Sequence, residues 1–170
     1  MATQKVAYAG VVAETLTGTS LGSNASREGT LIVNTSNDYI DAIVSGKVTV
    51  GAAAALGPVF LWFSSSDATN ISYPATGSDA AITIPIFALG GLTIGQKIPG
   101  TELVFFTALQ LAGVAATTAF PFANLSIAQA FNNNIPPQWA VGITNCQGQA
   151  FDATAGHTVI NYNGITFTIA

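Results

Sequence analysis

The chain has 170 residues, of which 49% are hydrophobic and only 7% are charged, with a formal net charge of −4. The hydrophobic fraction excludes a disordered chain, because it offers enough apolar surface to offset the entropy lost on folding. Ordinary soluble domains carry about 25% charged residues, so here short neutral side chains must cover the surface. Such a surface causes little repulsion between copies, and we expect a homo-oligomer.

Charge and cysteine content exclude further classes of protein. Four basic residues are present, and none follows Lys97. They cannot form a cationic patch that neutralises several phosphates, so nucleic acid is not an expected partner. The single Cys146 cannot form an intrachain disulfide, and Glu14 interrupts the short apolar stretch where a signal peptide would lie. We therefore expect the protein to be made in a reducing cytoplasm. Its length of 170 residues fits a single domain over residues 1–170.

Short apolar runs rich in Val, Ile, Phe and Thr alternate with Gly, Ser, Asn and Pro along the whole chain. This spacing is typical of sandwiches and jelly rolls. The fold class predicted is all-β, a jelly-roll-like antiparallel β-sandwich of eight or nine strands. The strands are expected near residues 5–12, 29–34, 39–50, 58–64, 81–87, 102–111, 138–144 and 157–169.

Two of these strands carry more specific predictions. The turn-forming residues 35–38 separate segments 29–34 and 39–45, which predicts that these segments pair as an antiparallel hairpin. Every position from Val59 to Phe63 is apolar, as expected of a strand that is buried on both faces.

Two longer segments raise other possibilities. The polar loop 65–80 is the expected projection from the surface and a candidate contact site. Residues 103–120 form an uncharged apolar stretch that reaches the lower length limit for a transmembrane helix. Gln110 within it, Pro121 at its end and the lack of later basic residues argue against a membrane span.

The C-terminal part predicts one short helix and one ambiguous segment. Ser126 followed by Gln129 resembles a capping box, so a helix is expected near 126–132. Asn163-Gly164 lies between two strand-like runs. It predicts either a tight type I′ hairpin or one continuous strand with a bulge marked by glycine.

The inventory of reactive side chains is small. His157 is the one histidine, and its use as a base with Asp152 as the orienting group, or with Cys146 as nucleophile, lacks any supporting motif. Carboxylates are scattered, glycines follow no phosphate-binding spacing, and a zinc or calcium site is not indicated. We expect no catalytic residue, no metal and no cofactor.

Large aromatic residues stand beside prolines at two junctions between loop and strand. They are Phe120 and Phe122, which flank Pro121, and Trp139 after Pro136-Pro137. Such rings serve either as lids on the core or as anchors in a partner's pocket.

Several segments form a recognisable pattern when taken together in chain order. They are Arg27-Glu28-Gly29, 34–42, Gly46-Lys47-Val48, Phe120-Pro121-Phe122, 135–141, Gly156-His157 and 162–165. This pattern resembles that of small virion structural proteins of tailed bacteriophages. Members of that family usually carry a basic residue before the tryptophan, whereas this chain has Gln138, so an ionic contact at that position is not expected.

Within that class, the chain is most similar to capsid decoration (cement) proteins. The resemblance implies a homotrimer on the capsid surface of the virion that binds the major capsid protein across capsomer joints, with residues 1–12 as an N-terminal arm that forms the clamp. The candidate interface residues are Lys5, Val6, Tyr8, Tyr73, Phe120, Phe122 and Trp139.

Two other functions remain open. A tail or fibre module would recognise a host-surface receptor or carbohydrate through loops such as 65–80. An enzyme of the β-sandwich type, such as a depolymerase fragment, lacks the expected pair of carboxylates.

Overall fold

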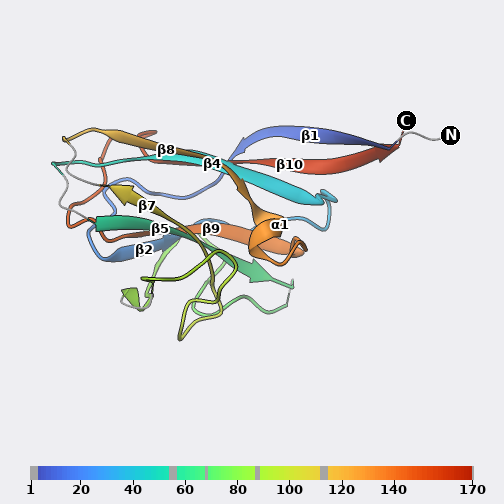
Figure 1. Cartoon of the computed structure of the whole chain (residues 1–170), viewed down its shortest axis with the longest axis horizontal. Helices are drawn as coiled ribbons and strands as arrows, with labels where there is room; N and C mark the ends of the chain where they lie inside the picture. Colours follow the sequence, from blue (N-terminus) through green and yellow to red (C-terminus); the bar gives the residue numbers. More distant parts are fainter. Residues whose placement is uncertain (1–3, 54–56, 68, 87–88, 112–114, 170) are drawn as a thin grey trace.

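The computed structural model describes residues 4–53, 57–67, 69–86, 89–111 and 115–169. Two antiparallel sheets lie face to face, with one short helix at one end (Figure 1). Sheet A contains, in spatial order, β1 (Gln4–Ala13), β10 (Val159–Ile169), β4 (Asp41–Thr49) and β8 (Ala119–Ser126). Sheet B contains β6 (Ala80–Ile82), β2 (Ala25–Glu28), β9 (Gln138–Asn145), β5 (Gly57–Ser66) and β7 (Val104–Leu111), with β3 (Ile32–Val33) also paired to β9.

The strand order is that of a jelly roll. When the short strands β3 and β6 are set aside, successive strands alternate between the sheets, except that β5 and β7 are neighbours in sheet B. The two orders, β1-β10-β4-β8 and β2-β9-β5-β7, are those of two interlocked Greek keys. The predicted all-β sandwich is therefore confirmed.

The predicted hairpin between 29–34 and 39–45 is wrong. β3 pairs with β9, whereas β4 pairs with β10 and β8, so the two segments lie in different sheets. The turn itself forms, since the Asn34 side chain accepts a hydrogen bond from the Tyr39 N–H at 2.9 Å. Turn residues specify that the chain reverses locally, but they do not specify which strand it joins.

Other strand predictions differ in extent. The segment 29–34 holds only β3, and a separate strand, β2, precedes it. The segment 81–87 contributes only the end of β6, and residue 87 lies outside the described residues. β8 was not expected, because Pro121 and Asn124 interrupt its apolar pattern. Pro121 is tolerated because β8 is an edge strand of sheet A.

Two predictions for the C-terminal part have clear outcomes. β10 is one continuous strand, so the alternative of a tight hairpin at Asn163-Gly164 is wrong. Helix α1 (Ile127–Ala130) begins after Ser126, whose side chain accepts a hydrogen bond from the Gln129 N–H at 3.0 Å, as the capping pattern predicts.

The core is divided by sheet B. β5 is buried on both faces, as predicted: Leu61 and Phe63 belong to the cluster between the sheets, and Trp62 belongs to a second cluster under the loops that cover the far face of sheet B. Gly142 on β9 lies directly under the Trp62 ring, where a Cβ atom would come within 2.1 Å of it.

The apolar stretch 103–120 is not a helix in the part that is described. It contains β7 and the first residues of β8, and residues 112–114 lie outside the described part. Across the described residues, no helix has the length and apolar character needed to cross a membrane.

Candidate interaction surface

β1 and β10 extend beyond the sandwich as a two-stranded ribbon. They pair from Gln4 opposite Ile169 to Ala13 opposite Asn161, whereas β10 pairs with β4 only as far as Ile165. The outer part of the ribbon therefore has no strand on its other side, and it leaves the body of the molecule as a projection (Figure 1). We call residues 4–8 and 165–169 the arm.

A β-bulge lies where the ribbon leaves the sandwich. The register shifts between Tyr8 and Val11, and Gly10 adopts a φ of 98°, which is accessible to glycine at little cost. The Gly10 N–H donates a hydrogen bond of 3.1 Å to the Asn163 side-chain oxygen. Because a bulge increases the local twist, it turns the arm relative to the rest of sheet A.

The arm exposes apolar side chains on one face. Opposite residues of antiparallel strands share a face, so Val6 lies beside Phe167 and Tyr8 beside Ile165. Val6 is 56% exposed, Tyr8 66% and Phe167 50%, which are high values for residues of this size.

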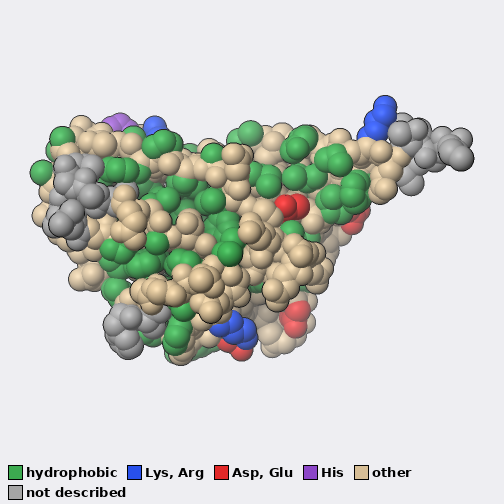
Figure 2. Space-filling view, in the orientation of Figure 1, with side chains coloured by type: hydrophobic (Ala, Val, Ile, Leu, Met, Phe, Trp, Pro, Cys, Tyr) green, Lys and Arg blue, Asp and Glu red, His purple; other side chains and the backbone are tan. Residues whose placement is uncertain are grey.

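This apolar face continues past the bulge. Val11, which is 71% exposed, lies opposite Asn163. Asn163 is on the same side of β10 as Ile165 and Phe167, because side chains on one side of a strand alternate. On β10 the alternate residues Ile160 and Gly164 are buried, so this apolar side of the sheet faces away from the core. Figure 2 shows hydrophobic side chains at the surface where the arm leaves the sandwich, with acidic side chains beside them. We call Val6, Tyr8, Val11, Ile165 and Phe167 the outer face.

The predicted interface residues fall into two groups. Lys5, Val6 and Tyr8 lie on the arm, and Tyr73 is 68% exposed in the 65–80 loop. By contrast, Trp139 is fully buried, with its ring 5.3 Å from that of Tyr162.

Phe122 is also buried, and Phe120 packs half-buried against the same central core. Phe122 and Trp139 therefore act as core residues here and offer no surface to a partner. Phe122 on β8 and Trp139 on β9 point into the core because they lie on the inner faces of the two sheets.

Sequence reasoning missed Phe167 and Val11. Phe167 alternates with Thr166 and Thr168, which is the pattern of a strand with one apolar face. That pattern alone does not reveal that the apolar face is uncovered, because this depends on where sheet A ends.

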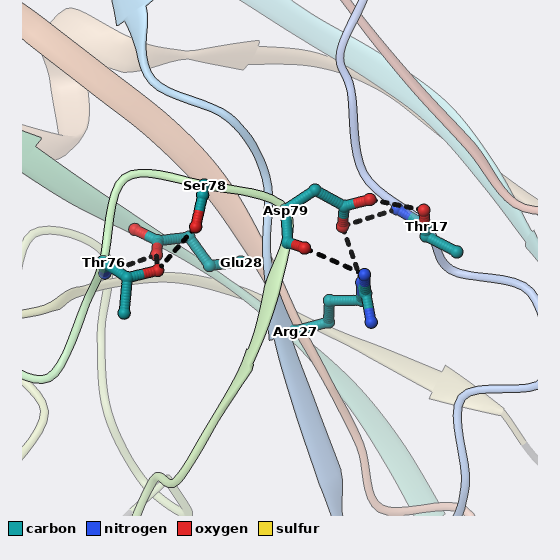
Figure 3. Close-up of polar contacts among 6 residues, drawn as sticks. All are labelled: Thr17, Arg27, Glu28, Thr76, Ser78 and Asp79. Carbon is teal, nitrogen blue, oxygen red and sulfur yellow. Dashed lines mark hydrogen bonds and ion pairs between the residues drawn. The ribbon is translucent and has the colours of Figure 1, made fainter.

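Buried carboxylates of sheet B hold loops in place. Glu28 is fully buried and accepts a hydrogen bond from the Thr76 N–H at 2.7 Å (Figure 3). It also accepts hydrogen bonds from Ser64 Oγ at 2.7 Å and from the Gly77 N–H at 3.0 Å. All these donors lie within the fold, so Glu28 anchors the end of the 65–80 loop against β2 and β5.

A second carboxylate contact lies next to Glu28. Arg27 Nε donates to Asp79 at 2.6 Å, and Thr17 also binds this carboxylate through its N–H and hydroxyl (Figure 3). These bonds keep the pKa of Asp79 below its ordinary value, although partial burial opposes the shift. Asp79, which directly precedes β6, therefore connects this strand to β2 and to the segment that follows β1.

Glu14 is the exception among the buried carboxylates. It follows the last residue of β1, is 8% exposed, and neither carboxyl oxygen has a well-formed hydrogen-bond partner among the described residues. Burial raises the pKa of Glu14 to about 9; the backbone of Val141 opposes this shift, and the nearby carboxylates of Glu28 and Asp79 add to it. At neutral pH the side chain is therefore protonated and uncharged.

His157 and Asp152 lie together, with 3.3 Å between Nδ1 and Oδ1. Asp152 also accepts a hydrogen bond from the Thr154 N–H at 2.7 Å, and these contacts lower its pKa. The same corner is held by the Thr49 hydroxyl, which donates to the His157 carbonyl at 2.5 Å. The pair thus stabilises the turn that precedes β10.

The remaining candidates for chemistry are Cys146 and clustered metal ligands. Burial raises the pKa of the Cys146 thiol, which disfavours the nucleophilic thiolate. Within the described ranges, no group of three or more His, Cys, Asp or Glu side chains could hold a metal ion.

A groove of about 780 Å³ lies beside Tyr73 on the opposite side of sheet B from sheet A. Its walls are mainly aliphatic and include Pro74, Ile82 and Ile84, with Thr76 and Thr101 as polar groups.

No protein-family model matches the chain, and no curated protein or solved structure is significantly similar to it. Jelly rolls occur in viral capsid proteins, lectins and cupins, so the fold alone does not select a function. The features that distinguish this molecule are the uncovered arm and the groove at Tyr73.

Proposed function

We propose that this chain is a non-enzymatic structural subunit of a virus particle, a capsid decoration (cement) protein that binds across capsomer joints. The observation that carries the proposal is the arm, whose apolar face is left exposed by a single subunit. Exposed apolar clusters of this kind mark interaction surfaces, since leaving them in water has a free-energy cost. The resemblance to phage virion proteins supports the choice of particle.

The neutral surface supports an assembled state. Only 7% of the residues are charged, so there is little electrostatic repulsion between copies of the subunit or between a subunit and the shell. A cement subunit needs no reaction chemistry, because it strengthens the shell by burying area across joints between capsomers. In this proposal the subunit is a homotrimer on the capsid surface, and its partner is the major capsid protein.

The test is to add purified protein to shells that lack it and to image them by cryo-electron microscopy. Regular density at capsomer joints, with a mass of three chains for the free protein, is the expected result. Density confined to the tail, or no bound density, would overturn the proposal.

The second candidate is a tail or fibre module that binds a host-surface receptor or carbohydrate. The groove beside Tyr73 favours it, because an exposed aromatic ring over a concave surface is a common feature of ligand sites. This function predicts that Tyr73→Ser abolishes binding of the isolated protein to host cells. A cement protein would bind shells normally with the same substitution.

A further inference from the structure

The two faces of the arm differ in chemistry. The outer face carries Val6, Tyr8 and Phe167, whereas the opposite face carries Lys5 paired with Thr168. Lys5 is the only charged residue in β1 and β10. The charged residue next to the outer face is Asp41 of β4, which lies opposite Ile165 and accepts hydrogen bonds from Ser126 Oγ at 2.7 Å and from the Ala128 N–H at 2.9 Å. An apolar surface can therefore cover Val6, Tyr8 and Phe167 on the arm without burying Lys5.

The exposed area of the outer face is large enough for association between two copies. Tyr8 and Phe167 are 66% and 50% exposed, and with about 200 Å² for a full aromatic side chain they leave about 230 Å² uncovered. The exposed parts of Val6 and Val11 bring the total to about 400 Å². Two such faces would together bury about 800 Å², which falls in the range of weak specific complexes that bury less than about 1,200 Å².

We propose that the partner of the outer face is the outer face of another copy of this chain, so that arms pack together in the oligomer. This deepens the proposed function, since it names the contact that joins the subunits of the decoration protein. In the proposed trimer the same face of each copy points toward the threefold axis, so three neutral, apolar outer faces can pack against one another. Tyr8 and Phe167 supply the aromatic anchors of this contact.

Contact between the outer faces would cover the exposed apolar side chains, whereas pairing between the edge strands would not. β1 is an edge strand of sheet A and could add a strand from a second copy. In such a pair around a two-fold axis normal to the sheet, both outer faces would lie on the same side and stay exposed. Face packing covers Val6, Tyr8 and Phe167 of both copies.

The test measures the mass of the full-length protein against concentration by analytical ultracentrifugation. The wild type is expected to be an oligomer, and the double variant Tyr8→Ser, Phe167→Ser is expected to associate at least 100-fold more weakly. Tyr73→Ser is the matched control, because Tyr73 is equally exposed but lies in the 65–80 loop. Lys5→Gln tests the opposite face, and both controls should keep the wild-type mass.

A monomeric wild type, or a double variant with the wild-type mass, would overturn the proposal. Far-UV circular dichroism of each variant guards against misfolding, which is not expected because both rings lie outside the core.

The outcomes separate this inference from the proposed function. An oligomer that depends on the arm but does not bind shells would support the arm contact and overturn the cement proposal. A monomer that binds shells through the arm would do the reverse, and would assign the outer face to the capsid instead of a second copy.

Discussion

Glu14 predicts an unusual dependence of stability on pH. Its pKa in the folded protein is raised to about 9 from an ordinary value of 4.5, mainly because the carboxylate is desolvated. Between these two values the folded protein keeps a proton that the unfolded chain releases. Stability is therefore fully present below pH 4.5 and falls as the pH rises toward 9.

The magnitude follows from the size of the shift. Each unit of pH within this window lowers the free energy of unfolding by about 1.4 kcal/mol. From pH 5 to pH 8 the loss attributable to Glu14 is about 4 kcal/mol, a large fraction of the total for a domain of this size. Glu14→Gln replaces the protonated carboxyl with a neutral group of the same shape, which removes this loss.

The assay is unfolding in urea at pH 5 and pH 8, at one protein concentration so that any association contributes equally. The wild type should lose about 4 kcal/mol more than Glu14→Gln between the two conditions. Glu102→Gln, at an exposed carboxylate, should follow the wild type. If the wild type and Glu14→Gln lose stability in parallel, Glu14 is not held uncharged in the folded protein and the reasoning fails.

Two further substitutions test the packing and the polar contacts. Glu28→Ala leaves buried donors without an acceptor and should lower stability by about 3–5 kcal/mol and the melting temperature by about 10 °C, whereas Glu102→Ala should change either by little. A wild-type melting temperature for Glu28→Ala would contradict the anchoring role. Gly142→Ala should cost about 3 kcal/mol or more, because its Cβ atom would overlap the Trp62 ring, while Gly90→Ala, with open space around it, serves as the control in the same thermal scan. Equal melting temperatures for the two glycine variants would show that Trp62 can move aside.

Some features of the molecule could be read directly from the sequence, because they depend on neighbouring residues. The unbroken apolar run from Val59 to Phe63 indicates a strand covered on both sides, and β5 has a core cluster on each face. Ser126 followed by Gln129 predicts the start of a helix, since capping joins a side chain to an amide three residues later. The spacing of short apolar runs likewise predicts the sandwich.

Strand partners and burial of single residues could not be read in this way. Residues 35–38 form a turn whether the chain returns to the same sheet or crosses to the other. The prolines before Trp139 are equally compatible with a surface anchor and with the buried position that the ring occupies. Local chemistry is the same in both cases, and the packing of the two sheets decides between them.

The interaction surface shows the same division. The alternation of Ile165 and Phe167 with threonines determines that β10 has one apolar side. Only the tertiary structure decides that this side is uncovered, because β10 runs on past its partner β4 and pairs there with β1 alone. Local periodicity sets which side chains share a face, whereas exposure depends on contacts between segments separated by more than a hundred residues.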